Sequence, residues 1–415
     1  MSVEIIIVGG GIAGLYSAYQ IKKLSPTTSF LILEGFQKKW FGGRIGTDKF
    51  YGVDVVRGAG IGRKKKDKLL LKLCKELGVE TKDFTSSREY APTIQPPCHV
   101  EKTFLSLKRE FKEDEEKNSK KTFREFALPL LGKEGYKNFT ICSSYTDYEK
   151  ESAFDVLYNY GFDDNYRSFT AVQINWNQLT NSLLTAIGPK NLHFSKMVEK
   201  IRLQPNDYEN FELVCKDGSS YSCNQLILAT TIESVQKLIP PIDPQSKYLY
   251  DQIHGQPFLR VYGKFSKSSL PVLNTYIQGG KLVVPGPLQK IIPMDREKGV
   301  YMIAYSDNQA AEYLKPYLKN TEKNRDFFCD ILEKTVGMPE NSIHLLEIKD
   351  YYWPIGTHYY EPLLDSFKTR KEFIRAAQKP LPNLLVVGEM ISENQGWTEG
   401  ALESVDSVVT KKWIK

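Results

Sequence analysis

Two hydrophobic patterns alternate along the first part of the chain. IIIV (5–8) is an unbroken apolar run, and after three glycines Ile12, Leu15 and Tyr19 recur at helical spacing. An unbroken run predicts a strand that is buried on both faces, whereas the i, i+3, i+7 spacing predicts a helix with one apolar face. SFLILE (29–34) predicts a second buried strand. The order strand, glycine turn, helix, strand is typical of the βαβ unit of a parallel sheet.

Similar patterns return in three later segments. HFSKMVEKIRLQ (193–204) predicts a strand, and CNQLILATTIESVQKLI (223–239) predicts a buried strand followed by a helix. LLVVGEM (384–390) predicts another strand, followed by a polar loop and a helix that begins near Thr398. Their order after the first βαβ unit indicates that they resume the same domain.

Two insertions interrupt that domain. The first contains KREFKEDEEKNSKKTFREF (108–126), whose mixed charges at helical spacing predict a solvent-exposed helix. The second contains HGQPFLRVYGKFS (254–266) and YMIAYSDNQ (301–309), which are strand-like runs separated by polar turns. We therefore expect two interleaved domains, one formed by 1–80, 171–240 and 380–415 and the other by 81–170 and 241–379.

Composition and charge favour a soluble globular protein. The chain has 415 residues, of which 41% are hydrophobic and 26% charged, as in ordinary soluble proteins with sizeable cores. The net charge of +6 is small against 56 basic and 50 acidic residues, and the basic run GRKKKDK (62–68) is more typical of a solvated face than of a nucleic-acid or lipid site. No stretch approaches the roughly 20 apolar residues of a membrane helix. Because the chain begins directly with a predicted strand, we expect no signal peptide.

The cysteines form no CxxC pair and have no metal-like spacing. There are six of them: Cys74, Cys98, Cys142, Cys215, Cys223 and Cys329. We expect free thiols in a reducing compartment, a cytoplasmic location and no metal site.

The glycine turn carries the first candidate chemistry. Gly9, Gly11 and Gly14 give GxGxxG between a strand and a helix. The first glycine permits the tight turn, the second lets the backbone approach a pyrophosphate, and the third lets the helix pack closely on the strand. Glu34 follows Gly14 at the end of the next strand, where a carboxylate accepts hydrogen bonds from ribose hydroxyls. Together they predict a dinucleotide site.

EGFQKKWFGGRIGT (34–47) indicates which dinucleotide is bound. Gly42, Gly43 and Arg44 follow the ribose acid closely, and a guanidinium fork suits phosphate oxygens or the edge of a flavin. Taken alone, GGR also fits a surface turn with a solvated arginine.

The order GxGxxG, acid, GGR-x-x-T resembles the flavin-dependent amine oxidases, a family that includes monoamine and polyamine oxidases, L-amino-acid oxidases and flavin histone demethylases. The resemblance implies FAD, with its pyrophosphate on the first helix. It extends to YGVDVVRGAGIG (51–62) beside the flavin ring, to Val-x-x-Ile at 198–201 near adenine, and to the closing GE…GWTEGA motif, although Arg57 departs from an apolar family position. The further cofactor-binding residues that it implies are Gly58, Ala59, Gly60, Ile61, Val198, Ala229, Thr230, Gly388, Glu389, Trp397, Thr398 and Ala401.

The resemblance also implies a substrate site. In the family two aromatic rings flank the substrate in front of the flavin, and Trp397 matches one of them. The other is expected from YYWPIGTHYY (351–360), with Tyr359 preferred and Trp353 as its support or substitute. A core role is the alternative for both Trp353 and Trp397. Where the family has a lysine near flavin N5, this chain has Arg260, with Lys264 as the candidate in a shifted register.

The sequence thus predicts an α/β protein, with a Rossmann-like FAD-binding domain and an interleaved α+β substrate domain. By resemblance, its function is an FAD-dependent oxidoreductase, an amine oxidase that transfers hydride to flavin N5 with oxygen as the final acceptor. No cysteine matches the covalent attachment site of monoamine oxidases, so non-covalent FAD is expected, with His358 as the nearby residue that leaves a covalent bond open. A desaturase-like or protoporphyrinogen-oxidase-like enzyme with a non-amine substrate and a flavin-binding protein without turnover are the alternatives. The substrate and the oligomeric state stay open.

Overall fold

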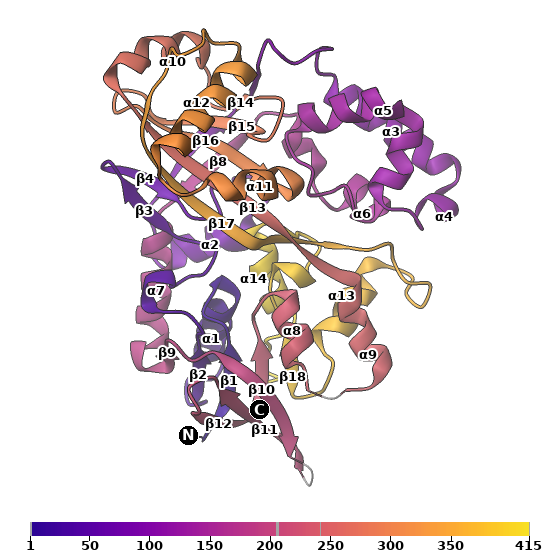
Figure 1. Cartoon of the computed structure of the whole chain (residues 1–415). Helices are drawn as coiled ribbons and strands as arrows, with labels where there is room; N and C mark the ends of the chain where they lie inside the picture. The colour runs from indigo at the N-terminus through magenta and orange to yellow at the C-terminus, as the bar shows by residue number, and fades with distance from the viewer. Residues whose placement is uncertain (1, 205–206, 241, 415) are drawn as a thin grey trace.

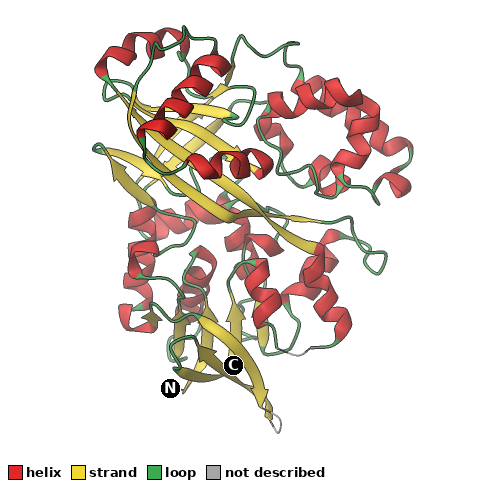
Figure 2. Ribbon diagram, in the orientation of Figure 1, coloured by secondary structure: helices red, strands yellow, loops and turns green. Residues whose placement is uncertain are grey.

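Two large β-sheets, each with its own helices, form the body of the molecule (Figures 1 and 2). The structure is a computed structural model that describes residues 2–204, 207–240 and 242–414. Both ends of the described chain lie at the lower sheet in Figure 1. The lower sheet therefore contains the earliest and the latest parts of the chain, while the upper sheet comes from the middle.

The lower sheet has a parallel centre in which β2, β1, β12 and β18 lie side by side. Ile5 and Ile7 of β1 pack against helices on one face, and Ile6 and Val8 pack against the other layer. Burial of both faces explains the unbroken apolar runs. Its strands are β1 (Ser2–Val8), β2 (Phe30–Leu33), β9 (Leu192–His193), β10 (Val198–Gln204), β11 (Asp207–Cys215), β12 (Ser220–Leu228) and β18 (Leu384–Val386).

Helices cover both faces of this sheet, as expected for a doubly wound α/β layer. On one face lie α1 (Ile12–Leu24), α2 (Lys68–Glu76), α7 (Trp176–Ile187) and α14 (Thr398–Asp406). On the other lie α8 (Ile232–Leu238) and α13 (Arg370–Gln378), with α9 (Pro244–Tyr248) nearby. The predicted strand and helix over 223–239 are confirmed by β12 and α8.

The upper sheet is mainly antiparallel, and its two longest strands, β13 and β17, pair along their length. Its six strands are β7 (Glu89–Tyr90), β13 (Ile253–Phe265), β14 (Leu282–Val283), β15 (Lys290–Asp295), β16 (Val300–Asp307) and β17 (Leu345–Tyr360). One face is covered by α10 (Leu270–Tyr276), α11 (Asn308–Leu314) and α12 (Glu322–Val336). The strands predicted over 254–266 and 301–309 are confirmed by β13 and β16.

Smaller elements connect the two layers. The hairpin β3 (Thr47–Phe50) and β4 (Val53–Val56) packs on the upper sheet, and a three-stranded sheet contains β5 (Gly62–Arg63), β6 (Thr81–Ser86) and β8 (Phe169–Ile174). The short 3₁₀ helices are η1 (Lys38–Trp40), η2 (Phe162–Asn165), η3 (Pro189–Asn191), η4 (Leu249–Gln252), η5 (Lys267–Ser269), η6 (Lys315–Tyr317) and η7 (Glu389–Ile391).

The single exposed helix predicted over 108–126 is wrong. The segment divides among α3 (Val100–Glu113), α4 (Glu115–Asn118) and α5 (Phe123–Ser143), which form a helical lobe with α6 (Ala153–Tyr158). Asp114 caps α4, and Thr122 with Glu125 forms a capping box that starts α5. Phe111 and Phe123 are fully buried in the lobe. Charge at helical spacing concealed both the caps and the buried aromatic residues.

The continuous strand predicted over 193–204 is also interrupted. It is divided into β9 and β10, and between them Ser195 has a positive φ of 57°. The N–H of Lys196 donates to the carbonyl of Glu34, so this turn folds back against the end of β2. After this turn β10 begins at Val198.

The prediction that all six cysteines are free thiols is wrong for one pair. Cys98 and Cys142 form a disulfide that joins the segment before α3 to the end of α5. The spacing of these two residues in the sequence, 44 positions, carries no signal of their proximity. The other four cysteines are free and buried.

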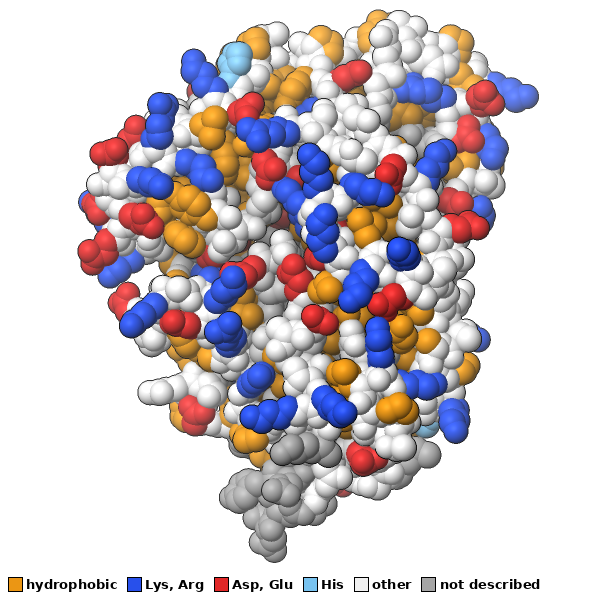
Figure 3. Space-filling view, turned by 180° about the vertical axis from the view of Figure 1, so that it is seen from behind, with side chains coloured by type: hydrophobic (Ala, Val, Ile, Leu, Met, Phe, Trp, Pro, Cys, Tyr) orange, Lys and Arg blue, Asp and Glu red, His pale blue; other side chains and the backbone are white. Residues whose placement is uncertain are grey.

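The basic run at 62–68 does not form an unpaired cationic patch. Lys64 lies 3.0 Å from Asp83, and Lys66 lies 2.8 Å from Asp163 and 2.9 Å from Asp164. On the face shown in Figure 3, lysines and arginines are interspersed with acidic residues. In 2–204, 207–240 and 242–414, no helix is both long and apolar enough to cross a membrane.

Candidate active site

The glycine turn between β1 and α1 has the close contacts that its motif predicts. Gly9 has a φ of 109°, and a Cβ there would lie 2.4 Å from the carbonyl oxygen of Ala229. A Cβ on Gly14 would lie 1.9 Å from the carbonyl oxygen of Gly9. At Gly11, by contrast, the nearest atom to such a Cβ is 4.0 Å away. Gly9 and Gly14 are therefore required by the fold, while Gly11 leaves open space at the N-terminus of α1.

Glu34 closes the same turn from the end of β2. Its buried carboxylate accepts the N–H of Gly10 at 2.6 Å and the N–H of Phe36 at 2.7 Å. The side chain is thereby fixed at the edge of the glycine turn. A carboxylate in this position can accept hydrogen bonds from ribose hydroxyls.

The GGR segment lies against this turn. Gly42 and Gly43 have positive φ values of 89° and 63°, and Gly42 bridges to Gly11. A Cβ on Gly58 would lie 2.2 Å from the carbonyl oxygen of Arg44, which also accepts the N–H of Ala59 at 2.9 Å. The two predicted flavin segments, 42–44 and 58–61, are thus in direct contact.

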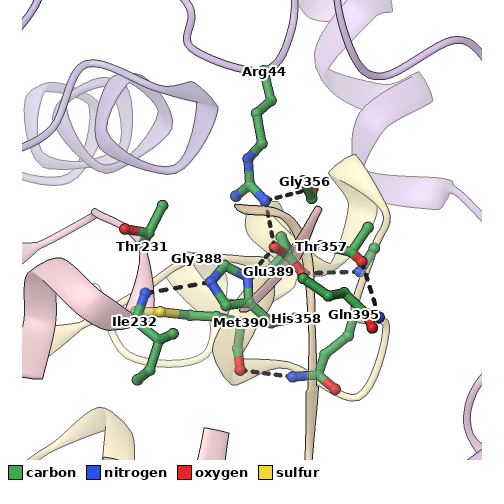
Figure 4. A network of polar contacts seen from close by, with 12 residues as sticks. Arg44, Thr231, Ile232, Gly356, Thr357, His358, Gly388, Glu389, Met390 and Gln395 are labelled. Atoms are coloured by element: carbon green, nitrogen blue, oxygen red, sulfur yellow. Dashed lines mark hydrogen bonds and ion pairs between the residues drawn. The ribbon is translucent and has the colours of Figure 1, made fainter. Parts of the chain in front are cut away.

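Glu389 is the centre of a buried polar network (Figure 4). Its Oε1 accepts from Arg44 Nη1 at 2.7 Å and from His358 Nδ1 at 2.5 Å, and its Oε2 accepts the N–H of Gly396 at 2.9 Å. Burial alone would raise the pKa of Glu389, but the neighbouring His358 and Arg44 outweigh it and lower this pKa to about 2. Glu389 is therefore a carboxylate at neutral pH.

Both ring nitrogens of His358 are engaged in this network. Nε2 accepts the N–H of Ile232 at 3.3 Å, so the ring proton is on Nδ1 and is donated to Glu389 (Figure 4). Arg44 also donates to the carbonyl of Gly356 in β17 at 2.8 Å. The network consequently ties the lower sheet and the closing segment to the upper sheet.

Arg57, the departure from the family pattern, has a structural partner. Its guanidinium pairs with Asp48 at 2.7 Å and donates to the carbonyl of Lys39 at 2.8 Å. The carbonyl of Arg57 accepts from Trp353 Nε1 at 2.8 Å. The residue holds the η1 segment, β3 and β17 together.

The closing helix α14 begins at Thr398, directly after Trp397. Gly388 has a φ of 138°, and its N–H donates to Ser404 in the helix at 2.8 Å. Glu399 accepts the N–H groups of two residues at the start of α2, at 2.7 and 2.8 Å. The N-terminus of α14, with its partial positive charge, is thus fixed at the site.

One cavity of about 2560 Å³ joins these features to the upper sheet. Every predicted cofactor-binding residue lines it except Gly14, whose predicted role is helix packing. The upper sheet contributes Arg260 from β13 and Trp353 from β17. The glycine turn and the candidate substrate residues therefore line the same cavity.

The predicted aromatic residues lie in different surroundings. Trp397 lines the cavity, with the guanidinium of Arg63 3.8 Å from its ring centroid. Trp353 also lines the cavity and meets Trp40 edge-on at 6.2 Å. Tyr359 is not among the lining residues, and its ring lies 5.2 Å from that of His254. Nothing in its position supports the cage role predicted for Tyr359.

Arg260, rather than Lys264, is the β13 cation that faces the cavity. Its guanidinium lies 3.9 Å from the ring centroid of Tyr305, and its Nη2 is 3.5 Å from where a Cβ on Gly60 would be. Lys264 does not line the cavity and donates to the carbonyl of Lys298. Arg260 is thus adjacent to the predicted flavin segment at 58–61.

Sequence reasoning missed a polar cluster on the cavity wall next to Arg260. Tyr145, Asp147 and Tyr160 line the cavity, and the hydroxyl of Tyr160 donates to Asp147 at 2.7 Å. Burial and the nearby Asp307 raise the pKa of Asp147 to about 7. These residues come from the segments after α5 and α6, which carry no motif, so only the tertiary fold shows them. Within 2–204, 207–240 and 242–414, no His, Cys, Asp and Glu residues are grouped as a metal site.

The comparisons with known proteins identify the family. Residues 100–405 match the flavin containing amine oxidoreductase family, so the chain belongs to it. The chain is therefore a flavin-dependent oxidoreductase of the amine oxidase type.

Other comparisons extend over almost the whole chain. It is 22% identical, over 491 aligned positions, to the uncharacterized protein R188 of Acanthamoeba polyphaga mimivirus, an alignment that covers 99% of this chain and 94% of the relative. Among solved structures, wild-type putrescine oxidase bound to putrescine has a TM-score of 0.75 at 14% identity, with 99% and 98% of the two chains covered. A double mutant of putrescine oxidase has a TM-score of 0.76 at 14% identity and the same coverage. At this identity the structural likeness concerns the fold.

Proposed function

We propose that the protein is an FAD-dependent oxidase of an amine and binds FAD without a covalent bond. The observation that carries the proposal is the continuous cavity, which joins the glycine turn to Arg260, Trp353 and Trp397. A dinucleotide needs an elongated site with a phosphate cradle at one part and a flavin pocket at another. The likeness to putrescine oxidase, which was solved with putrescine bound, supports an amine as substrate.

The residues present fit FAD. The open space at Gly11 leaves the N–H groups at the start of α1 free to meet a pyrophosphate. The fixed carboxylate of Glu34 suits a ribose, and the N-terminus of α14 suits an electron-rich ring edge. Val198, Ala229 and Thr230 line the same cavity.

The non-covalent proposal rests on the nucleophiles around the cavity. His358 uses both ring nitrogens in hydrogen bonds. No cysteine is among the lining residues, and the four free thiols are buried. A covalent bond to the cofactor would need one of these groups to be free at the cavity.

The chain's own residues would bind and orient the substrate. Trp397, held by Arg63, and Trp353, held by its hydrogen bond to the carbonyl of Arg57, present fixed ring surfaces to the cavity. The upper sheet covers the site and limits the access of water, which favours a neutral amine nitrogen. FAD, when bound, supplies a two-electron acceptor for the hydride of the carbon beside that nitrogen, with molecular oxygen as the final acceptor.

We also propose the division of the chain into a cofactor domain (1–80, 171–240 and 380–415) and a substrate domain (81–170 and 241–379). Its support is that all strands of the lower sheet fall in the first set, and five of the six upper strands fall in 241–379. The cytoplasmic location stays a prediction.

A second candidate function is the oxidation of a substrate that is not an amine. Arg260 favours it, because a lysine can lose its proton when it is buried, whereas arginine keeps its charge. Amine chemistry therefore cannot use Arg260 as a base.

An anaerobic visible spectrum tests the proposal. The purified protein, reconstituted with FAD, is mixed with polyamines, monoamines and amino acids in turn. Bleaching of the oxidised flavin by one class of amine is the expected result, and release of the flavin on denaturation without proteolysis would support non-covalent binding. Failure to bind FAD would contradict the proposal. A flavin that stays oxidised with every amine would favour the second candidate.

A further inference from the structure

Among the residues that the structure describes, three arginines are almost fully buried, and one of them has no carboxylate partner there. Arg63, 2% exposed, pairs with Asp67 and Asp164, and Arg370, 4% exposed, pairs with Asp155 at 2.6 Å. Arg260 is 7% exposed, and it forms no ion pair with any acid in the described part of the chain. A buried cation without a counter-charge is costly, so its partner is expected to be a molecule that the cavity binds.

The surroundings of Arg260 stabilise its charge without neutralising it. Its guanidinium stacks on Tyr305 at 3.9 Å, and Nη1 contacts the sulfur of Met302 at 3.5 Å. Lys290, which is fully buried beside the same ring, differs, because burial lowers its pKa well below the usual range and a lysine can become neutral. Arginine cannot lose its proton in this way. Arg260 therefore stays a cation at the cavity wall.

Among the described residues, none of the acids that line the cavity forms an ion pair with Arg260. Lys281 lines the cavity without an ion pair in the described residues, and burial with the adjacent Arg88 lowers its pKa to about 7. Asp147 also lines the cavity, but its carboxyl is bound by Tyr160 and holds its proton up to near neutral pH. A second ammonium group, as in a diamine, would be repelled by Arg260 across a short distance in a low-dielectric site.

We propose that Arg260 binds the carboxylate of the substrate, so that the amine oxidised here is an amino acid or another amine that carries a carboxylate, rather than a diamine. A planar guanidinium matches a carboxylate in geometry and charge. The inference rests on the proposed amine oxidase function and names the substrate class of that same site.

The test uses pairs of compounds that differ only in a carboxylate. The FAD-loaded protein is titrated with L-phenylalanine against phenethylamine and with L-ornithine against putrescine, and anaerobic bleaching of the flavin is followed. 3-Phenylpropanoate, which has no amine to oxidise, gives the affinity for the carboxylate alone through the change in the flavin spectrum. The variants are Arg260→Met, Arg260→Lys and, as a matched control on the same strand, Lys264→Met.

We expect each amino acid to bleach the flavin faster than its decarboxylated partner. Arg260→Met should weaken binding of 3-phenylpropanoate about 10- to 100-fold, since a charged hydrogen bond is lost. Arg260→Lys should retain part of the affinity, and Lys264→Met should retain all of it. Since Arg260 has no acidic partner, the Tm of the Arg260→Met apoprotein should not fall, so lost binding would not reflect unfolding.

Equal binding of 3-phenylpropanoate to the wild type and to Arg260→Met would overturn the proposal. So would faster bleaching by putrescine and phenethylamine, or a shift in the flavin potential of Arg260→Met with no change in carboxylate affinity. Arg260-dependent binding of 3-phenylpropanoate without bleaching by any amine would contradict the oxidase function while the carboxylate subsite stands. Bleaching by diamines without binding of 3-phenylpropanoate would support the oxidase function and contradict the carboxylate subsite.

Discussion

At the scale of single residues, Glu389 connects parts of the chain that are hundreds of positions apart. It accepts from Arg44, from His358 of β17 and from the backbone of Gly396, all in a buried position. Three donors on one carboxylate explain how the ionised form is stable there.

Replacing Glu389 with glutamine should weaken FAD binding. Gln keeps the volume but loses the charge, so Arg44 and His358 lose a charged acceptor worth roughly 1.5–3 kcal/mol, which corresponds to about 10- to 100-fold in the dissociation constant. Fluorescence titration of the apoprotein with FAD measures the loss. Glu393→Gln, in the same loop but paired with Lys371 at the surface, is the control. Unchanged FAD affinity in Glu389→Gln would show that the network does not support the cofactor site.

Asp147 should make the stability of the protein depend on pH. Burial and Asp307 raise its pKa from 3.8 to about 7. The folded state therefore holds the proton more tightly than the unfolded state, and folding loses stability as the pH rises from about 4 to 7, by on the order of 3 kcal/mol, and then no further. Asp147→Asn removes this loss, while its amide oxygen can still accept from Tyr160.

Denaturant melts of Asp147→Asn and the wild type at several pH values measure this effect. Relative to the wild type, the free energy of unfolding of the variant should be little higher at pH 4, and the difference should increase up to pH 7 to 8. Asp54→Asn, at a side chain that is 54% exposed, is the control without a burial penalty. If Asp147→Asn raised the free energy of unfolding by the same amount at pH 4 and pH 8, Asp147 would not be the cause of the pH dependence.

Residues could be predicted where a short motif fixes their roles. The glycine turn, Glu34 and Glu389 come from such motifs, and the structure brings them to one cavity. The partners of Glu389, Arg44 and His358, are set by the tertiary fold, and the binding roles of all these residues stay predictions. Tyr359 shows the limit. Residues 350–357 of β17 all line the cavity, but the strand extends past its end before Tyr359, which lies opposite His254. The length of a strand relative to a cavity is a tertiary property.

At the scale of elements, the glycine turn separates two requirements. Gly14 lies under the backbone of Gly9 and determines how closely α1 packs on β1. Gly11 begins the helix with ordinary backbone angles, φ −74° and ψ −178°, and leaves room in front of it. Gly14 thus serves the packing between elements, while Gly11 leaves the space that the proposed cofactor would occupy.

Alanine at Gly14 should therefore affect the stability of the apoprotein, whereas alanine at Gly11 should affect the affinity for FAD. Gly14→Ala places a Cβ 1.9 Å from a backbone oxygen, so the apoprotein should lose several kcal/mol or fail to fold. Gly11→Ala meets no atom within 4 Å other than Gly42 at that limit, so the apoprotein Tm should change little while FAD affinity falls at least tenfold. Thermal melts without FAD, followed by FAD titration, distinguish them. Equal destabilisation of both apoproteins would contradict this division of roles.

The order of elements could be predicted more reliably than their ends. Strands β1, β2 and β12 follow from apolar runs, because burial in a sheet requires them. The interruptions at Ser195 and between α3 and α5 could not be predicted. The first is a backbone turn and the second depends on side-chain caps, and both are seen only in the folded chain. Glu399 is similar: its role at the start of α2 joins elements 330 positions apart.

At the scale of the whole molecule, the cavity exists only because two interleaved parts of the chain meet. The glycine turn and α14 come from the first and last segments, while Arg260 and Trp353 come from the upper sheet. The helical lobe contributes a third wall through Tyr145 and Asp147. The disulfide lies in this lobe, away from the glycine turn.

Loss of the disulfide should destabilise the protein without removing the cofactor. A cross-link across 44 positions stabilises by about 3–4 kcal/mol in the chain-entropy account. Cys98→Ser with Cys142→Ser should therefore lower the Tm, and a reductant should lower that of the wild type to the same extent. FAD content should stay the same, because the glycine turn and Glu389 are outside the lobe.

The double variant is also the control, since a reductant must leave its Tm unchanged. Titration of the denatured wild type without reductant should count four thiols of six, and six thiols would contradict the cross-link. The same count decides the predicted cytoplasmic location, because a reducing cytosol keeps structural cysteine pairs as thiols. Protein from cells that are quenched with acid and then alkylated in denaturant, so that the buried thiols also react, should show six blocked cysteines if it functions in such a compartment. Four blocked cysteines would place it where the Cys98–Cys142 bond persists, and the cytoplasmic prediction would then be wrong.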